Sequence, residues 1–327
     1  MSTPFASLTP DAVLNASEAL GLEPDGRLFA LNSYENRVYR LGREDSDAVI
    51  LKFYRADRWS DQQILEEHAF ATELAAQEIP VAAPLALQGK TLHHHAEFRL
   101  AAFPLCAGGA PELDQAGARE LLGRTLARIH AVGALRPFRY RPTLERSMLG
   151  VKSRETMLRS ALLPSHMREQ YGHVSAELLE GIEDAFAAAA PVSLIRLHGD
   201  CHLGNILWQP RGPLLVDLDD CLNGPRIQDL WMFLSGSEDE QRKQWSEIAQ
   251  GYRQFGSIDF RELRLIEPLR ALRMLNHAAW VAARWQDPAF PRAFPWAAEA
   301  RFWEGYVGDL NQQCQLLDAP PILVGDL

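Results

Sequence analysis

The sequence predicts an α+β protein with an N-terminal antiparallel sheet carrying one main helix, followed by a mainly helical C-terminal part. The chain has 327 residues, 47% of them apolar, which is enough for about two domains with cores of their own. Apolar residues alternate at strand spacing in several segments before Phe103 and recur mostly at helical spacing beyond it. The Gly- and Pro-rich stretch PLCAGGAPELD separates the two patterns. We therefore expect an N-terminal lobe over 1–104 and a C-terminal lobe over 105–327.

The N-terminal lobe begins with a helix and continues with strands. Thr9 is placed to cap the helix, Pro10 suits its first turn, and Gly21 follows its end. RLFAL and RVYRL flank the polar turn NSYEN at 32–36, which predicts a β-hairpin. DAVILKFY predicts a third strand, and this strand carries Lys52.

The rest of this lobe is expected to be one helix and two strands. SDQQILEEHAFATELAAQ, over 60–77, has apolar residues at helical spacing. APLALQ and TLHHHAEFRLAAF are expected to be strands joined by a turn at Gly89-Lys90. Together with the first three strands, these two strands form the predicted sheet, and the helix is the main helix of the lobe.

The C-terminal lobe is predicted to be helical except near its centre. Helices are expected over ARELLGRTLARIHAVG, from about 154 to 163, over SAELLEGIEDAFAAAA, and over most of 241–317. In 193–219, two strand-like apolar pieces bracket the polar motif RLHGDCHLGNILW. Polar side chains close to apolar segments cost free energy unless they are hydrogen-bonded or bind something. The motif is therefore the first candidate for a functional site.

Composition excludes several classes of protein. Lys and Arg total 33 against 43 for Asp and Glu, and the net charge of -10 argues against a nucleic-acid partner. No apolar run approaches the ~20 residues of a membrane helix, and the start lacks the features of a signal peptide, so we expect a cytoplasmic protein with no membrane partner. The four cysteines are far apart without a C-x-x-C pair, which favours reduced thiols over disulfides or zinc. No heptad pattern requires a partner subunit, so we expect a monomer.

The motif supplies residue types that suit phosphoryl transfer. Asp200 and Asn205 lie five residues apart, and Asp217 follows at the end of a predicted strand. One carboxylate can deprotonate a substrate hydroxyl, while an amide oxygen and a second carboxylate can hold Mg²⁺. Asp200 and Asn205 could instead cap turns, as such residues often do. That alternative leaves Asp217 and the upstream Lys52 unexplained.

The pattern H-G-D-x-x-x-x-N, followed by a strand that ends in V-D-L-D, resembles the aminoglycoside phosphotransferase and choline kinase superfamily, whose members are relatives of the protein kinases. LNSYENRVY, LKFYR-x-x-RW, QILEEH, LIEPLRA and DPAFP extend the resemblance along nearly the whole chain, to a bacterial family of stress-response serine/threonine protein kinases. The resemblance implies a two-lobed protein-kinase-like fold with a nucleotide-binding N-terminal lobe. It also implies ATP as co-substrate, Mg²⁺ as cofactor and a hydroxyl as phosphate acceptor.

Residue roles follow from this resemblance. Asp200 matches the proton acceptor, Asn205 a magnesium ligand, and Asp217 a metal-binding acid that also counts as an active-site residue. Lys52 matches the strand lysine that contacts the α- and β-phosphates of the nucleotide. Its helix partner is expected to be Glu67; the alternative is the neighbouring glutamate Glu66, which a helix turns about 100 degrees away.

Two further residues are candidates with open alternatives. Ser33 lies in the hairpin turn that takes the place of a kinase glycine-rich loop, and no G-x-G-x-x-G occurs there. Its hydroxyl and nearby backbone N–H groups could contact phosphate, or the turn could be an ordinary polar turn. Asp219 could reach a second metal ion, or it could be a solvated or capping residue.

The sequence leaves open which class of molecule accepts the phosphate. Gly199 stands where regulated protein kinases keep an arginine, no A-P-E sequence is present, and only eleven residues separate Asp217 from Asp229. Control by phosphorylation of an activation segment is therefore not expected. Chain-wide similarity favours a protein serine/threonine kinase acting in stress response. The short segment and the acidic residues Asp219, Asp220 and 237–240 favour a small-molecule hydroxyl kinase for choline, homoserine, a sugar or an aminoglycoside. A pseudokinase-like binding module is disfavoured by the intact acidic residues and lysine.

Overall fold

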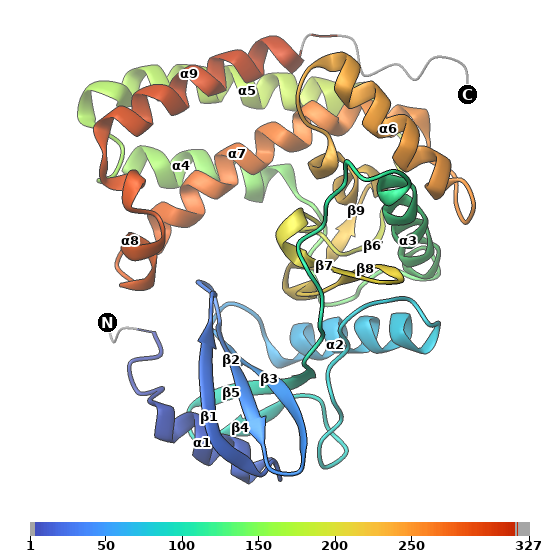
Figure 1. Ribbon diagram of the computed structural model, residues 1–327. Helices are drawn as coiled ribbons and strands as arrows, with labels where there is room; N and C mark the ends of the chain where they lie inside the picture. Colours follow the sequence, from blue (N-terminus) through green and yellow to red (C-terminus); the bar gives the residue numbers. More distant parts are fainter. Residues whose placement is uncertain (1–3, 318, 320–327) are drawn as a thin grey trace. The chain divides into compact units, whose positions relative to one another are not determined.

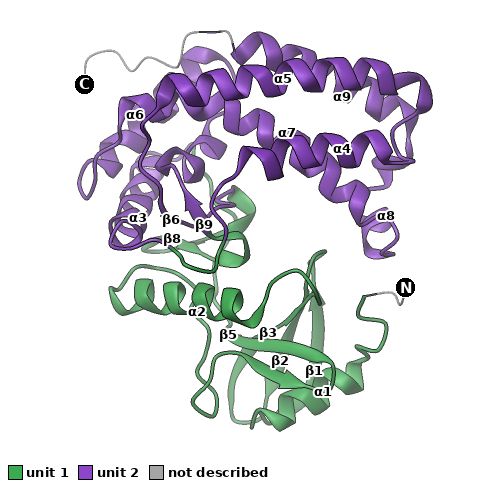
Figure 2. Ribbon diagram, turned by 180° about the vertical axis from the view of Figure 1, so that it is seen from behind, with its two compact units in different colours: residues 1–113, 138–141, 203–221 green, residues 114–137, 142–202, 222–327 purple. Residues whose placement is uncertain are grey.

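The computed structural model describes residues 4–317 and 319, and the chain forms two compact units (Figure 2). Unit 1 takes its described residues from 1–113, 138–141 and 203–221, and unit 2 takes its own from 114–137, 142–202 and 222–327. The predicted α+β class is confirmed, with a sheet in unit 1 and mostly helices in unit 2 (Figure 1). The boundary predicted after residue 104 remains a prediction. Unit 1 continues to residue 113 and also includes the later segments 138–141 and 203–221.

Unit 1 is built around a five-stranded antiparallel sheet with the strand order β1-β2-β3-β5-β4. A separate hairpin of β7 and β8 also belongs to this unit. Thr9 caps the first helix as predicted, accepting a hydrogen bond from the Ala12 N–H. The bounds of these elements are α1 Pro10–Ala19, β1 Pro24–Leu31, β2 Arg37–Arg43, β3 Ser46–Tyr54, α2 Asp61–Ala76, β4 His93–His95, β5 Phe98–Pro104, β7 Ile206–Gln209 and β8 Gly212–Leu215.

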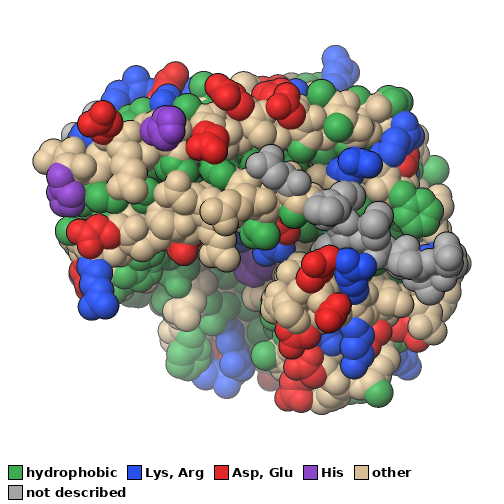
Figure 3. All heavy atoms as spheres, turned by 90° about the horizontal axis from the view of Figure 1, so that it is seen from above, with side chains coloured by type: hydrophobic (Ala, Val, Ile, Leu, Met, Phe, Trp, Pro, Cys, Tyr) green, Lys and Arg blue, Asp and Glu red, His purple; other side chains and the backbone are tan. Residues whose placement is uncertain are grey.

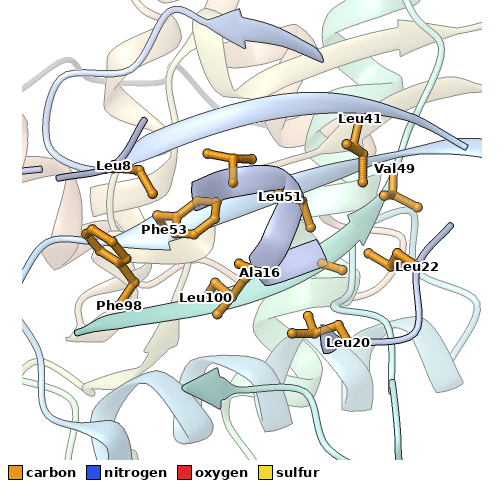
Figure 4. Close-up of a cluster of buried hydrophobic side chains, with 12 residues drawn as sticks. Leu8, Ala16, Leu20, Leu22, Leu41, Val49, Leu51, Phe53, Phe98 and Leu100 are labelled. Carbon is orange, nitrogen blue, oxygen red and sulfur yellow. The ribbon is translucent and has the colours of Figure 1, made fainter. Parts of the chain in front are cut away.

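The two faces of strand β3 have different surroundings. Leu51 and Phe53 point into an apolar cluster in which α1 contributes Ala16 (Figure 4). The alternate residue Tyr54 belongs to a second cluster with Ile64 of α2. Side chains alternate between the faces of a strand, so Lys52 is on the face that carries Tyr54. The period of the sequence therefore places this lysine beside α2.

The prediction of a strand before Gly89-Lys90 is wrong, while the segment after it contains two strands, β4 and β5. Residues 83–88 form no strand, and the hairpin is β4–β5, whose turn lies at Ala96 and Glu97. Leu85 donates its backbone N–H to Ala102, and Leu87 and Lys90 form only an isolated bridge. Ala96 adopts φ 50, a conformation that favours glycine. Residue preferences therefore indicated the turn at Gly89 and gave no sign of the one at Ala96.

Unit 2 contains the predicted helices and a two-stranded ladder of β6 and β9. Helix α3 spans the predicted residues, while α5 begins before the predicted start at Ser175. α5 lies beside α9, and α4 lies beside α7 (Figure 1). The bounds are α3 Ala118–Gly133, α4 Lys152–Arg159, α5 Arg168–Ala189, β6 Ile195–Leu197, β9 Leu222–Gly224, α6 Glu238–Tyr252, α7 Ile266–Ala283, α8 Ala289–Ala293 and α9 Ala300–Leu317.

Surface and helix properties agree with the composition. None of the helices in the described part of the chain has the length and apolar character needed to cross a bilayer. On the face drawn in Figure 3, Lys and Arg side chains are interspersed with Asp and Glu side chains and form no broad basic area. The excess of acidic residues is therefore not offset by a basic patch on that face.

Helices α3 and α6 approach closely through glycines on both helices. A Cβ atom on Gly123 of α3 would lie 2.0 Å from the carbonyl oxygen of Ile248, and one on Gly251 of α6 would lie 1.9 Å from that of Glu120. Real Cβ atoms do not come this close to backbone. The absence of side chains at these positions is what allows the two backbones to touch.

We expect Gly251→Ala to lower the free energy of unfolding by about 1–3 kcal/mol, since overpacking a close contact forces the backbone to shift. Gly305→Ala in α9 is the matched control, because nothing lies within 4 Å of its Cβ position. That change should stabilise the protein by about 0.5–1 kcal/mol through helix propensity. Urea denaturation measures both, and equal stability of Gly251→Ala and the unchanged chain would contradict the close approach.

Candidate active site

Asn205 and Asp217 lie at the same end of the β7–β8 hairpin in unit 1. Ile206 pairs with Leu215, and Val216 donates its N–H to the Asn205 carbonyl at 3.0 Å. That bond extends the ladder by one step and brings the two candidate metal ligands together. Asp217 adopts φ 59, a strained conformation for a residue with a side chain. Such strain is typical of functional sites.

Lys52 is buried among three carboxylates of unit 1. Its Nζ lies 2.8 Å from Asp217 Oδ1, 3.0 Å from Asp219 Oδ1 and 3.9 Å from Glu67 Oε1. Burial alone would lower the pKa of this ammonium, but the charges of Asp217, Asp219 and Glu67 outweigh burial and hold it well above its usual value. Lys52 is therefore a fixed positive charge at neutral pH.

The two adjacent glutamates of α2 have separate environments. Glu67 is 3% exposed and is the one that faces Lys52. Glu66 instead accepts the backbone N–H groups of Arg139, Tyr140 and Arg141 at 2.6–2.7 Å. Burial first, and Asp219 in addition, raise the pKa of Glu67 to about 7, with Lys52 acting in the opposite direction. The geometry thus supports Glu67 as the partner of Lys52, and its contribution to nucleotide binding stays a prediction.

Asp219 is the buried centre of an ion-pair network, so the expectation of a solvated or capping residue is wrong. Only 3% of the residue is exposed. Besides Lys52, its carboxylate binds the guanidinium of Arg58 and the side-chain amide of Asn36, the latter at 3.1 Å. Burial raises the pKa of Asp219, but the positive charges of Lys52, Arg58 and Arg141 outweigh burial. The pKa therefore lies well below its usual value. The Asp219 carboxylate therefore pairs with the cations Lys52 and Arg58 of the protein itself.

Ser33 has a clear local role in the turn between β1 and β2. Its Oγ accepts the backbone N–H of Val38 at 3.1 Å and donates to the carbonyl of Leu31 at 3.3 Å. The hydroxyl thus closes the hairpin. Phosphate binding by Ser33 remains a prediction, and it would require one of these hydrogen bonds to be exchanged.

The loop that carries Asp200 belongs to unit 2 and is held from below by Asp229. This fully buried carboxylate accepts the backbone N–H groups of His198 and Gly199, both at 2.8 Å, and so ties down the loop. The ring of His130 lies 3.1 Å from Asp229 and 2.8 Å from the Tyr252 hydroxyl. Gly199 has φ 88, a conformation that an arginine at this position would adopt only under strain.

Asp200 has a cationic or polar partner on each oxygen. The guanidinium of Arg273 in α7 donates to Oδ1, and His202 Nε2 lies 3.5 Å from Oδ2. Burial raises the pKa of Asp200, but the hydrogen bond of His202 and the charge of Arg273 outweigh burial. The pKa therefore lies below its usual value. The carboxylate is therefore ionised at neutral pH and can accept a proton from a nearby hydroxyl as phosphate transfer proceeds.

Comparison with known proteins agrees with this chemistry. A family model described as the phosphotransferase enzyme family matches residues 28–269. The chain belongs to this family. It is 42% identical over 318 residues to stress response kinase A of Escherichia coli (strain K12) and to serine/threonine protein kinase RdoA of Salmonella typhimurium (strain LT2), and each match covers 97% of this chain and 96% of the relative. Membership makes it an ATP-dependent kinase.

A solved structure supports the same fold. The amicoumacin kinase hAmiN, in complex with AMP-PNP, Ca²⁺ and Ami, superposes with a TM-score of 0.74 at 20% sequence identity, covering 97% of this chain and 96% of that one. The two-lobed kinase-like fold implied by the sequence is thereby confirmed.

The donor chemistry of this phosphotransferase fits a magnesium ion that is also bound by phosphate. No group of three or more His, Cys, Asp and Glu side chains suited to a metal occurs in residues 4–317 and 319. Asn205 and Asp217 offer an amide and a carboxylate oxygen, and Mg²⁺ in phosphotransferases is typically held by one or two such groups together with substrate phosphates and water. These two residues fit the predicted ligand role, which stays a prediction.

Sequence reasoning missed the arginines of the site. Arg58 lies in the quoted stretch LKFYR-x-x-RW, and Arg273 follows the stretch LIEPLRA, yet neither had an assigned role. Arg141, 3% exposed, donates from Nε to the Cys221 carbonyl at 2.9 Å. Nothing in the local spacing separates these arginines from surface arginines, because their partners lie far away in the sequence.

Asp219→Ala is expected to lower the free energy of unfolding by about 3–5 kcal/mol, since it removes the carboxylate from a buried network and leaves Lys52 and Arg58 short of negative charge. Asp220→Ala is the control. The Asp220 side chain is 46% exposed and lies 2.6 Å from Arg58, so its loss should cost less than about 1 kcal/mol. Thermal and urea unfolding of the two variants measure the difference, and similar losses would contradict the central place of Asp219.

Proposed function

We propose that this phosphotransferase is a protein kinase that uses ATP and Mg²⁺ to phosphorylate serine or threonine hydroxyls in a stress response. The observation that carries the proposal is the similarity over 97% of the chain to relatives named stress response kinase A and serine/threonine protein kinase RdoA. The chain keeps every residue that the chemistry needs, namely Lys52, Asp200, Asn205 and Asp217.

The proposed reaction assigns one task to each of these side chains. Asp200 accepts the proton of the acceptor hydroxyl while the hydroxyl oxygen forms a bond to the γ-phosphorus, and the bond from that phosphorus to the β–γ bridging oxygen breaks to release ADP. Lys52 binds the α- and β-phosphates, and Glu67 keeps its ammonium in place. Asn205 and Asp217 would hold Mg²⁺. When bound, the ion neutralises charge on the transferred phosphate.

Binding of the nucleotide changes the partners of Lys52. In the structure its ammonium is 2.8 Å from Asp217 Oδ1, so each of these groups neutralises the other. Phosphate oxygens would take the place of Asp217 at Lys52, and Asp217 would then be available to hold Mg²⁺. One exchange of partners then keeps every charge paired, while Asp219 and Glu67 continue to hold the lysine.

A small-molecule hydroxyl kinase is the second candidate, and one of its two supports, the group of acidic residues, is weakened by the contacts of those residues. Asp219 is buried on cations, and Asp220 pairs with Arg58. The acids at 238–240 lie in the first turn of α6, where Glu240 forms a capping box with Ser237. Acidic residues are favourable at a helix N-terminus. These charges therefore have structural partners and do not by themselves indicate a cationic substrate.

The proposed function extends to the oligomeric state, location and partners of the enzyme. We propose that it acts as a monomer in the cytoplasm, without a nucleic-acid or membrane partner. The net charge of -10 supports the first exclusion.

Incubation with γ-labelled ATP and Mg²⁺ tests the acceptor. We expect label on serine or threonine of the protein itself or of added protein acceptors, and little transfer to a panel containing choline, homoserine, sugars and aminoglycosides. Phosphoamino-acid analysis identifies the product. Transfer confined to a small alcohol would show that the second candidate is the correct one.

Asp200→Asn is expected to reduce kcat/KM at least ~100-fold, because it removes the proton acceptor. Melting temperature and nucleotide binding serve as controls and should change little. Because Arg273 and His202 keep the pKa of Asp200 below its usual value, the required ionised form predominates at every pH above it, and protonation of Asp200 should cause no loss of rate from about pH 5 upward. A reduction below about tenfold would remove Asp200 from the assigned role.

A further inference from the structure

Arg273 places a positive charge directly on the carboxylate that is proposed to receive the acceptor's proton. Its guanidinium donates one N–H to Asp200 Oδ1, and the side chain is 40% exposed. Within residues 4–317 and 319, Asp200 is its only hydrogen-bonding partner. A guanidinium has five N–H donors in a planar fork. Further donors of Arg273 therefore remain for a ligand that approaches Asp200.

An aromatic surface continues from Arg273 along the same face of α7. His277 and Trp280 follow at positions i+4 and i+7, which bring them to that face. The His277 ring stacks on Trp280 with centroids 5.7 Å apart, and on Trp296 with centroids 6.3 Å apart. Phe294 meets His277 edge-on at 6.0 Å. His277 is exposed and the other three rings are half-buried, so part of this surface is open to a ligand.

The charge at Arg273 distinguishes between classes of acceptor. A cationic alcohol would approach a carboxylate whose charge is already neutralised, and it would lie beside a second cation. An anionic group next to the acceptor hydroxyl would bind the guanidinium fork through charge-assisted hydrogen bonds, an arrangement that suits carboxylates. The adjoining aromatic rings offer apolar contact to the remainder of such an acceptor.

Building on the proposed function, we propose that Arg273 selects a peptide acceptor in which the serine or threonine has an acidic neighbour. The acidic side chain binds the free edge of the Arg273 guanidinium, and the hydroxyl lies at Asp200. The His277 and Trp280 rings contact an apolar side chain of the same peptide. In this proposal Arg273 of α7 is a specificity-determining residue.

Three peptides of one sequence test the inference, with the single serine flanked by glutamate, glutamine or lysine. The measured quantity is kcat/KM with Mg²⁺ and ATP. We expect the glutamate peptide to exceed the lysine peptide at least about tenfold. Arg273→Gln should reduce this ratio to near one, and Arg273→Lys should restore part of it. A ratio is insensitive to a general loss of activity, so the variant remains informative even if its rate falls.

Arg270→Gln provides the matched control. Arg270 lies one turn earlier on α7, pairs with Glu267 at 3.1 Å and covers the ring of Trp231. Its removal deletes the same charge from the same helix without touching Asp200, so the peptide ratio should stay as in the unchanged enzyme.

Each outcome decides a separate question. Transfer to all three peptides without a preference, or a preference that survives in Arg273→Gln, overturns the role of Arg273 and leaves the protein-kinase proposal standing. Absence of transfer to any peptide, with transfer to a small hydroxy acid, overturns both, because the anionic acceptor is then a free molecule. A preference for the lysine peptide likewise overturns the inference.

Discussion

The burial of the Lys52 ammonium is the constraint on which the rest of unit 1 depends. An unpaired charge in an apolar interior costs several kcal/mol, so the lysine requires carboxylates from several elements. Helix α2 supplies Glu67, and the segment after β8 supplies Asp217 and Asp219. Asp219 in turn requires Arg58 and Asn36. The sheet, its helix and the β7–β8 hairpin are thereby joined through electrostatics as well as through their apolar cores.

Unit 2 holds a buried carboxylate mainly with backbone donors. Asp229 is fully buried and binds two consecutive backbone N–H groups of the loop that bears Asp200, with the His130 ring on the same carboxylate. Hydrogen bonds of this kind fix the backbone of the loop and do not involve the Asp200 carboxylate, which pairs with Arg273 and His202. The left-handed Gly199 allows the loop to present both N–H groups to Asp229. Asp229 therefore fixes the backbone of the loop that bears Asp200.

The success of sequence reasoning depended on the range of the interactions. Helix caps, strand alternation and the spacing of Asp200, Asn205 and Asp217 are local, and they indicated the fold class and the reaction correctly. The turn at Ala96 was missed because a non-glycine residue adopts a left-handed conformation there. The burial of Asp219 and the pairing of Asp200 with Arg273 were missed because each partner lies far away along the chain. Ion pairs between residues far apart in the sequence produce no periodic pattern from which they could be predicted.

The segment 138–141 has a consequence for how the protein is made. Glu66 receives three successive backbone N–H groups from this segment, and Arg141 stacks on Trp59 with 3.9 Å to the ring centroid. Pro80 and Ala82 bond to Leu215 in the same unit. A ribosome therefore has to release about two-thirds of the polypeptide before the first sheet has all its partners. N-terminal domains commonly fold first during synthesis, but here the Glu66 carboxylate lacks its partners until residues 139–141 have emerged, and the Lys52 ammonium lacks two of its carboxylates until Asp217 and Asp219 have emerged.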